Sequence, residues 1–300
     1  MKDIIIIGAG TAGMTAAIYA RRAGKSVLLF EKSVFGGQIV YSENVENYPG
    51  IDNISGADFS MNLYSQASAL GADFKIETVK EIRNGETKTV VTNKNEYETK
   101  AVIIAAGVKN RKLGLENEEK FIGRGVSFCA VCDGSFYKTQ PVAVVGGGST
   151  ALQDALYLSN NCETVYLIHR RDSFRGEESL VKAVEGKENI RLILNSEVKG
   201  IGGEEKLSSV TVRNRLTGEE TTLQVNALFE AIGQIPDNEI FSSSVLLDGQ
   251  GFIIAGENCK TNADGIFAAG DCRTKEIRQL TTAAADGAVA AIKAVEYIDA

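Results

Sequence analysis

Two stretches of this chain share one order of hydrophobic and polar positions. The apolar runs at 4–7 and 142–145 each lead directly into a glycine-rich segment. An alanine-rich helical pattern follows each segment, at 14–23 and 151–159, and a second apolar run comes after each helix. Short apolar runs separated by helical patterns predict parallel strands joined by helices. The chain is therefore predicted to have an α/β fold with two dinucleotide-binding domains of Rossmann type.

The rest of the pattern indicates how these two domains are connected. Buried strands that end in glycine are predicted at 101–107 and again at 265–271, on either side of the second βαβ unit. We therefore predict that the second domain is inserted into the first, with crossings near 111–115 and 236–241. The predicted boundaries divide the chain into 1–112, 113–239 and 240–300.

Three further segments have patterns of their own. Residues 79–99 alternate in polarity around Asn84-Gly85, which predicts a hairpin, and 192–225 predicts a comparable hairpin region. The alanine-rich pattern of 281–297 predicts a long helix.

Composition narrows the possible functions. The chain has 300 residues, 31 glycines, only 3 prolines and a net charge of −7. This length suits two domains, and the acidic balance argues against nucleic acid or an anionic membrane as a partner. No apolar run is long enough to span a membrane, and the run at 4–7 is too short for a signal-peptide core. We expect a cytoplasmic protein.

The first glycine-rich segment, 8–13, has the full dinucleotide fingerprint. Gly8 allows a tight turn, Gly10 lets the backbone approach a pyrophosphate, and Gly13 permits close packing of the helix. Glu31 ends the next predicted strand, where an acidic side chain would bond a ribose hydroxyl. This site is suited to a nucleotide with an uncharged ribose, as in FAD.

The second segment, 146–151, is followed by cations instead of an acid. Gly146, Gly148, Ser149 and Thr150 form the turn and the start of the helix, while the strand that follows ends in His169-Arg170-Arg171, with Arg175 close behind. A ribose that carries a 2′-phosphate needs positive charge at this position. The second site is therefore suited to NADPH, with His169 equally suited to a buried or capping role.

A pair of cysteines lies just before the second segment, in Cys129-Ala130-Val131-Cys132-Asp133. In a Cys-x-x-Cys turn, one thiol can have a lowered pKa and the pair can exchange with other disulfides. Asp133 lies next to the pair and could donate and accept the protons that exchange requires. Zinc would need about two more close ligands, so no metal site is predicted, and two inert core thiols are the alternative.

Asp271 and the remaining cysteines complete the set of candidates. Asp271 ends a predicted buried strand, where its carboxylate could bond the ribitol hydroxyls of a flavin or cap a helix. Cys162, Cys259 and Cys272 have no matching partner or motif, and we interpret them as structural.

Taken in order and spacing, these residues resemble the low-molecular-weight bacterial thioredoxin reductases of the pyridine nucleotide-disulfide oxidoreductase superfamily. The resemblance covers nearly the whole chain. Its motifs are Gly36-Gly37-Gln38, the segments 45–50, 129–134, 146–151 and 169–175, Ala231-Ile232-Gly233 with Pro236, 269–271, and Arg278-Gln279.

The resemblance implies a homodimer that binds FAD and NADPH and reduces thioredoxin. It implies FAD contacts at Gln38, Asn47, Asp271 and Gln279. It also implies that Cys132 is the sulfur nearer the flavin and that Asp133 is the active-site acid.

The chain departs from the family pattern at a few positions. Gln153-Asp154 stands where two glutamates are usual, Gln234 where histidine is frequent, and Val131 where threonine is common. None of these changes removes a group that the mechanism needs.

The predicted function is a flavin-dependent disulfide reductase that passes electrons from NADPH through FAD and Cys129–Cys132 to thioredoxin. Because the cysteines and NADPH belong to one domain and must both reach one flavin, we hypothesise a hinge rotation of the inserted domain. The alternatives are a related reductase fed by NADH or ferredoxin, one that serves another protein disulfide such as a peroxiredoxin system, and a redox-sensing flavoprotein that is not an enzyme.

Overall fold

The computed structural model describes residues 1–42 and 44–300. The chain forms two compact units, one of residues 1–109 and 235–300 and the other of residues 110–234. Two crossing strands, β7 (Val108–Asn110) and β16 (Gln234–Pro236), connect the units and pair with each other. The second unit is thus inserted into the first through a paired double crossing.

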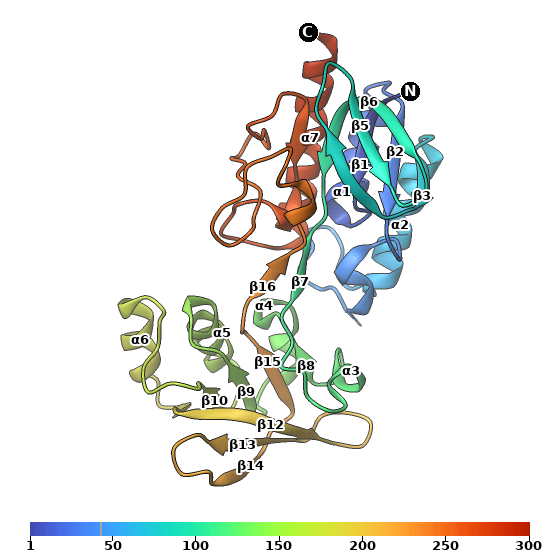
Figure 1. The fold of residues 1–300 in the computed structure, drawn as a ribbon. Coiled ribbons are helices and arrows are strands. Elements are labelled where there is room, and N and C mark those ends of the chain that lie inside the picture. The colour runs from blue at the N-terminus through green and yellow to red at the C-terminus, as the bar shows by residue number, and fades with distance from the viewer. Residues whose placement is uncertain (43) are drawn as a thin grey trace. The chain divides into compact units, whose positions relative to one another are not determined.

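The first unit is built around a mixed sheet with the strand order β3-β2-β1-β6-β5-β4, in which β17 also pairs with β6. Strands β1, β2, β3, β6 and β17 run parallel, whereas β4 and β5 form an antiparallel hairpin beside β6. Figure 1 labels these elements. Their bounds are β1 Lys2–Ile7, α1 Thr11–Arg22, β2 Val27–Glu31, η1 Gly37–Tyr41, α2 Gly56–Ala69, β3 Asp73–Ile76, β4 Val79–Arg83, β5 Lys88–Thr92, β6 Glu96–Ile104, η3 Glu239–Phe241, β17 Ile266–Ala268, η4 Gly270–Cys272 and α7 Leu280–Asp299.

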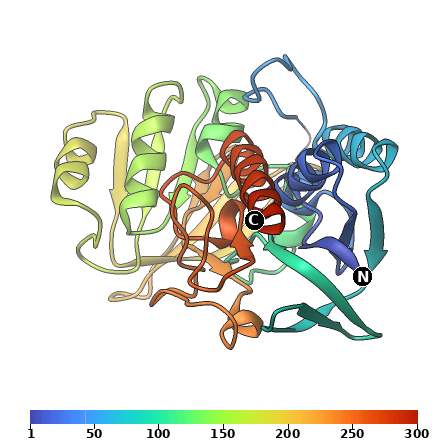
Figure 2. The same ribbon diagram turned by 90° about the horizontal axis from the view of Figure 1, so that it is seen from above.

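Side chains on the two faces of this sheet enter different cores. Ile4 and Ile6 of β1 pack with α1 and α7, whereas Ile5 and Ile7 pack with Phe241 and other residues from the segment before β17. Successive side chains of a strand point to opposite faces of the sheet. Because both faces of β1 are buried, the strand needs the continuous apolar run seen in the sequence. Helices α1 and α7 lie side by side, as Figure 2 shows.

The second unit repeats the plan on a smaller scale. Its parallel sheet has the order β11-β10-β9-β15-β8, with α5 and α6 on one face and the antiparallel strands β12-β13-β14 on the other (Figure 1). The bounds are α3 Glu118–Phe121, β8 Val126–Ser127, α4 Ala130–Asp133, η2 Gly134–Tyr137, β9 Val142–Val145, α5 Ser149–Ser159, β10 Val165–Ile168, α6 Glu178–Glu185, β11 Ile190–Ile193, β12 Ser196–Gly202, β13 Ser209–Asn214, β14 Glu220–Gln224 and β15 Ala227–Glu230.

The predicted α/β fold with two βαβ units is confirmed. In each unit the strand before the glycine-rich turn pairs in parallel with the strand after the helix, β1 with β2 and β9 with β10. The hairpin around Asn84-Gly85 is present as β4 and β5, and the long C-terminal helix is present as α7. None of the helices within 1–42 and 44–300 combines the length and the apolarity needed to cross a membrane.

Candidate active site

Cys129 and Cys132 form a disulfide at the start of a short helix. Their Cα atoms are 5.3 Å apart, and Cys129 caps helix α4 because its Sγ accepts a hydrogen bond from the backbone N–H of Cys132 at 3.2 Å. Both cysteines are partly exposed, and Val131 between them is 45% exposed. A disulfide that reaches the surface of its unit can exchange with a partner disulfide, unlike a pair of core thiols.

The carboxylate of Asp133 is held beside this disulfide by a serine that the sequence analysis did not single out. Ser127, buried at the end of β8, donates from Oγ to Asp133 Oδ2 at 2.6 Å and accepts from the N–H of Cys129 at 3.1 Å. The N–H of Asp133 in turn donates to the carbonyl of Cys129 at 3.1 Å. The structure therefore ties Asp133 to the cysteine turn, as a group that moves protons at these sulfurs requires.

The first glycine-rich turn connects β1 to α1 in the conformation that the fingerprint predicts. Gly8 has φ of +106°, and a Cβ on Gly13 would lie 1.9 Å from the carbonyl oxygen of Gly8. Only glycine avoids both the strain and the clash. Gly10 is the N-cap of α1 and forms no side-chain cap hydrogen bond, so the N–H groups at the start of this helix could bind the phosphates of a nucleotide.

Glu31 lies at the end of β2, directly against this turn. One carboxylate oxygen accepts the N–H of Ala9 at 2.9 Å, and the other accepts the N–H groups of Lys32 and Ser33 at 2.8 and 3.0 Å. The acidic side chain is thus fixed at the end of the strand adjacent to the fingerprint strand, where a ribose would lie.

Three other residues predicted to contact FAD come from separate parts of the first unit. Gln38 is exposed on η1, and Asn47 Nδ2 donates to Gln279 Oε1 at 3.3 Å, which joins two segments that are distant in the sequence. Gln279 is also the N-cap of α7. The structure brings Asn47 and Gln279 together, and their contacts with the cofactor stay predictions.

Asp271 lies in η4, between β17 and α7. Within the described part of the chain its Oδ1 is buried without a hydrogen-bond partner, although the residue as a whole is partly exposed. Burial raises the pKa of this carboxyl, against the opposing effect of Lys275 and Arg278. A buried acceptor without a donor is costly, and a hydroxyl-bearing ligand such as the flavin ribitol would supply the missing donor.

The two glycine-rich turns have different residues beside them, at the position where the second strand of each βαβ unit ends. The N–H of Gly8 bonds the carbonyl of Phe30, and the N–H of Gly146 bonds that of Ile168, so His169 occupies the place of Glu31. His169 is buried, and a Cβ on Gly147 would lie 2.0 Å from its ring. The histidine ring therefore packs directly against the glycine turn, and its contact with NADPH stays a prediction.

Positive charge gathers in the loop that follows His169. Arg170, Arg171 and Arg175 are exposed, and within 1–42 and 44–300 none of their guanidinium groups forms an ion pair. The N–H of Arg175 donates to the carbonyl of Gly147 at 2.8 Å, which holds this loop against the glycine turn. Ser149 begins α5 there, and its Oγ accepts the N–H of Glu177 at 3.2 Å, while Thr150 is exposed.

The other three cysteines are buried thiols. Burial raises the pKa of Cys162 and of Cys272 to about 11 and that of Cys259 to about 12. Thiols with such values are protonated at neutral pH and unreactive, in agreement with a structural role. Among residues 1–42 and 44–300, no three or more histidine, cysteine or acidic side chains form a group that could hold a metal ion.

Comparison with known proteins agrees with this geometry. The family of pyridine nucleotide-disulphide oxidoreductases matches residues 2–287. The thioredoxin reductase of Listeria innocua is 42% identical over 299 residues, which is 99% of this chain and 94% of that protein. This chain belongs to the thioredoxin reductases of that family. The Bacillus subtilis enzyme is 40% identical over 99% of this chain and 95% of its own length.

A solved structure of a thioredoxin reductase matches the chain closely over its full length. The crystal structure of the thioredoxin reductase from Streptococcus pyogenes covers 100% of this chain and 98% of its own, with a TM-score of 0.96 and 40% identity. The family, the fold class and the class of FAD- and NADPH-dependent oxidoreductase predicted from the sequence are confirmed by these matches.

Proposed function

We propose that this protein reduces the disulfide of a thioredoxin, with electrons that pass from NADPH through FAD to Cys129 and Cys132. The observation that carries the proposal is the placement of a partly exposed disulfide and an arginine-flanked nucleotide turn in one unit. The other unit has the glycine-rich turn at Gly8, where the acidic residue Glu31 takes the place of the cations. Relatives about 40% identical to this chain are named thioredoxin reductases, which supports thioredoxin as the substrate.

The first unit has the groups that FAD needs. The turn at Gly8, Gly10 and Gly13 and the N-terminus of α1 would hold the pyrophosphate, and Glu31 would bond the adenosine ribose. Gln38, Asn47 and Gln279 would lie along the flavin, and Asp271 Oδ1 would accept a ribitol hydroxyl. When bound, FAD would supply the hydride and two-electron chemistry that connects NADPH to the disulfide.

The cysteine pair and Asp133 then pass these electrons to the partner protein. Two electrons and two protons convert the Cys129–Cys132 disulfide into two thiols. One thiolate attacks the partner's disulfide and forms a mixed disulfide, and the second cysteine resolves it, which releases the partner as a dithiol and restores the disulfide. Asp133, which Ser127 holds next to Cys129, would donate and accept the protons.

The second unit would bind NADPH. The turn at Gly146 and Gly148, with Ser149 and Thr150 at the start of α5, would hold its pyrophosphate, and Arg170, Arg171 and Arg175 would bind the 2′-phosphate. The proposal further includes a homodimer, which the family resemblance implies, and a cytoplasmic location, which the sequence predicts from the lack of a signal-peptide core.

Anaerobic mixing of the purified flavoprotein with NADPH tests this function most directly. We expect rapid bleaching of the flavin absorbance with NADPH and slow bleaching with NADH at the same concentration, because only NADPH offers a 2′-phosphate to the arginines. Bleaching with neither nucleotide would contradict the proposed donor, and reduced ferredoxin would then be tested in its place. Bleaching without any reduction of thioredoxin would favour a redox sensor.

The hinge hypothesis concerns the paired crossings β7 and β16. A short bifunctional cross-linker that reacts with amines can link a lysine of residues 1–109 to a lysine of residues 110–234. We expect this link to lower turnover by about tenfold or more, because NADPH and the disulfide must each reach the flavin in every cycle. Peptide mapping identifies the linked fractions, and steady-state thioredoxin reduction measures the effect. Fractions linked only within one unit are the control, and full activity in the fraction linked between units would contradict the hinge.

A further inference from the structure

We propose that Asp286 is a positioning residue for FAD. It holds the Gly270–Asp271 turn in place without touching the cofactor. The inference rests on the proposed function, because it assumes that this turn binds the flavin ribitol. Asp286 lies in the second turn of α7, a helix that the sequence predicts only as a long alanine-rich segment.

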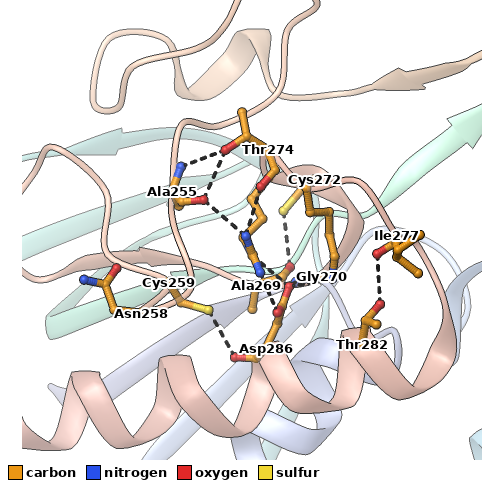
Figure 3. A network of polar contacts seen from close by, with 12 residues as sticks. Ala255, Asn258, Cys259, Ala269, Gly270, Cys272, Thr274, Ile277, Thr282 and Asp286 are labelled. Carbon is orange, nitrogen blue, oxygen red and sulfur yellow. Dashed lines mark hydrogen bonds and ion pairs between the residues drawn. The ribbon is translucent and has the colours of Figure 1, made fainter. Parts of the chain in front are cut away.

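The side chain of Asp286 reaches the turn directly. Its Oδ2 accepts the N–H of Gly270 at 2.9 Å, and Gly270 immediately precedes Asp271. Figure 3 shows Asp286 on the helix with Gly270 above it. Gly270 has φ of +78°, and glycine adopts positive and negative φ about equally readily. The hydrogen bond from Asp286 therefore fixes the direction in which the chain enters η4.

Two buried cations hold the carboxylate in its ionised form. Arg273 donates from Nε to Oδ2 at 2.8 Å and from Nη2 to Oδ1 at 2.7 Å, and Lys275 Nζ donates to Oδ2 at 2.9 Å. Burial disfavours the charged form of Asp286, but these hydrogen bonds outweigh it, so its pKa lies below the usual value. Bidentate contact with arginine also fixes the rotation of the carboxylate.

Arg273 is itself anchored to the surrounding backbone. Its Nη1 donates to the carbonyl oxygens of Ala255 and Thr274 at 3.2 and 2.9 Å, and its side chain is almost completely buried. Figure 3 shows Ala255 and Thr274 on the side of the network away from the helix. The network therefore connects α7, the segment before β17 and the turn at Gly270, with Asp286 at its centre.

The residue after Asp286 connects the same helix to the other half of the proposed FAD site. A Cβ on Gly287 would lie 2.2 Å from the carbonyl oxygen of Ala12, in the first turn of α1. Helix α7 thus touches the helix whose N-terminus would hold the pyrophosphate, while Asp286 holds the turn that would hold the ribitol. Neighbouring residues of α7 set the spacing between the two turns.

Release of FAD from the holoenzyme tests this inference. We expect Asp286→Asn to release FAD about tenfold faster or more, because Gly270 loses a charged acceptor and the turn loosens. Flavin fluorescence after dilution measures the release rate, and far-ultraviolet circular dichroism measures unfolding of the same samples. The matched control is Asp3→Asn, which removes another carboxylate of the first unit that accepts a backbone N–H, from Ser26 at 2.9 Å.

A triple variant separates positioning from the cost of unpaired buried charge. Arg273→Met, Lys275→Met and Asp286→Leu together replace the charged cluster with apolar side chains, which can leave stability nearly unchanged. The inference would be supported if this variant releases FAD faster while its circular dichroism shows no more unfolding than that of the wild type, and if Asp3→Asn releases FAD at the wild-type rate. Release at the wild-type rate in both Asp286 variants would overturn it, as would equal acceleration in Asp3→Asn. A wild-type protein without FAD to release would contradict the proposed function and this inference together.

Discussion

Replacing Cys132 with serine is expected to abolish reduction of thioredoxin while NADPH still reduces the flavin. The disulfide with Cys129 is the group that takes two electrons and passes them to another disulfide, and one remaining thiol cannot do this in a catalytic cycle. We expect a loss of about a thousandfold or more in kcat/KM for thioredoxin, since the sulfur removed takes part in every exchange of sulfur–sulfur bonds. The first half-reaction uses the nucleotide turns alone, so the rate of flavin bleaching is expected to change by no more than about twofold.

The matched control for this variant is Cys162→Ser in the same unit. Cys162 is buried in the core below α5 and forms no disulfide, so the same chemical change there should leave both half-reactions intact. Stopped-flow absorbance measures flavin reduction, and insulin precipitation with added thioredoxin measures the complete reaction. Full thioredoxin reduction by Cys132→Ser would remove the cysteine pair from the mechanism.

The sequence predicted the elements whose signals are local. The strands β1, β2, β9 and β10 are continuous apolar runs. A glycine-rich turn follows β1 and β9, and charged or polar residues mark the ends of β2 and β10. Helix α2 and strand β8 were not predicted. In β8 only Val126 and Ser127 pair with β15, and a pairing so short leaves no periodic pattern to detect.

Two polar groups of the site also escaped prediction, for a physical reason that they share. Ser127 and Asp286 act through hydrogen bonds to groups that other segments bring close, Asp133 in one case and the N–H of Gly270 in the other. A serine at a strand end and an acid in an alanine-rich helix both look like exposed polar positions. Only the fold shows that each is buried and has a partner.

The pair of nucleotide turns illustrates the opposite case. Glu31 and His169 were compared in the sequence because each ends a strand after a fingerprint, and the hydrogen bonds of Gly8 and Gly146 show that the two positions correspond. The sequence could not decide whether His169 meets a ligand or the core. The structure places its ring against Gly147 and leaves the three arginines after it exposed, while a contact of His169 with NADPH stays a prediction.

Replacing Arg170 and Arg171 together with alanine is expected to raise the KM for NADPH about 10- to 100-fold and that for NADH by no more than about threefold. A hydrogen bond from a guanidinium to a phosphate contributes about 1.5–3 kcal/mol, and roughly 1.4 kcal/mol corresponds to a factor of ten in affinity. The lower figure of the range allows for solvent screening, because both arginines are exposed. NADH has no phosphate at this position, so its binding does not depend on these cations.

Steady-state kinetics with both nucleotides at low and high salt measures this effect. The advantage of NADPH over NADH in the wild type should shrink as salt rises, whereas the double variant should show little dependence on salt, because the charges being screened are gone. Arg191→Ala is the matched control, since Arg191 is an exposed arginine near the start of β11, at the end of the sheet opposite the glycine turn. Equal increases in KM for NADPH and NADH would mean that Arg170 and Arg171 act on something common to both nucleotides. The preference for a 2′-phosphate would then have to come from Arg175 alone, which the corresponding single variant would reveal.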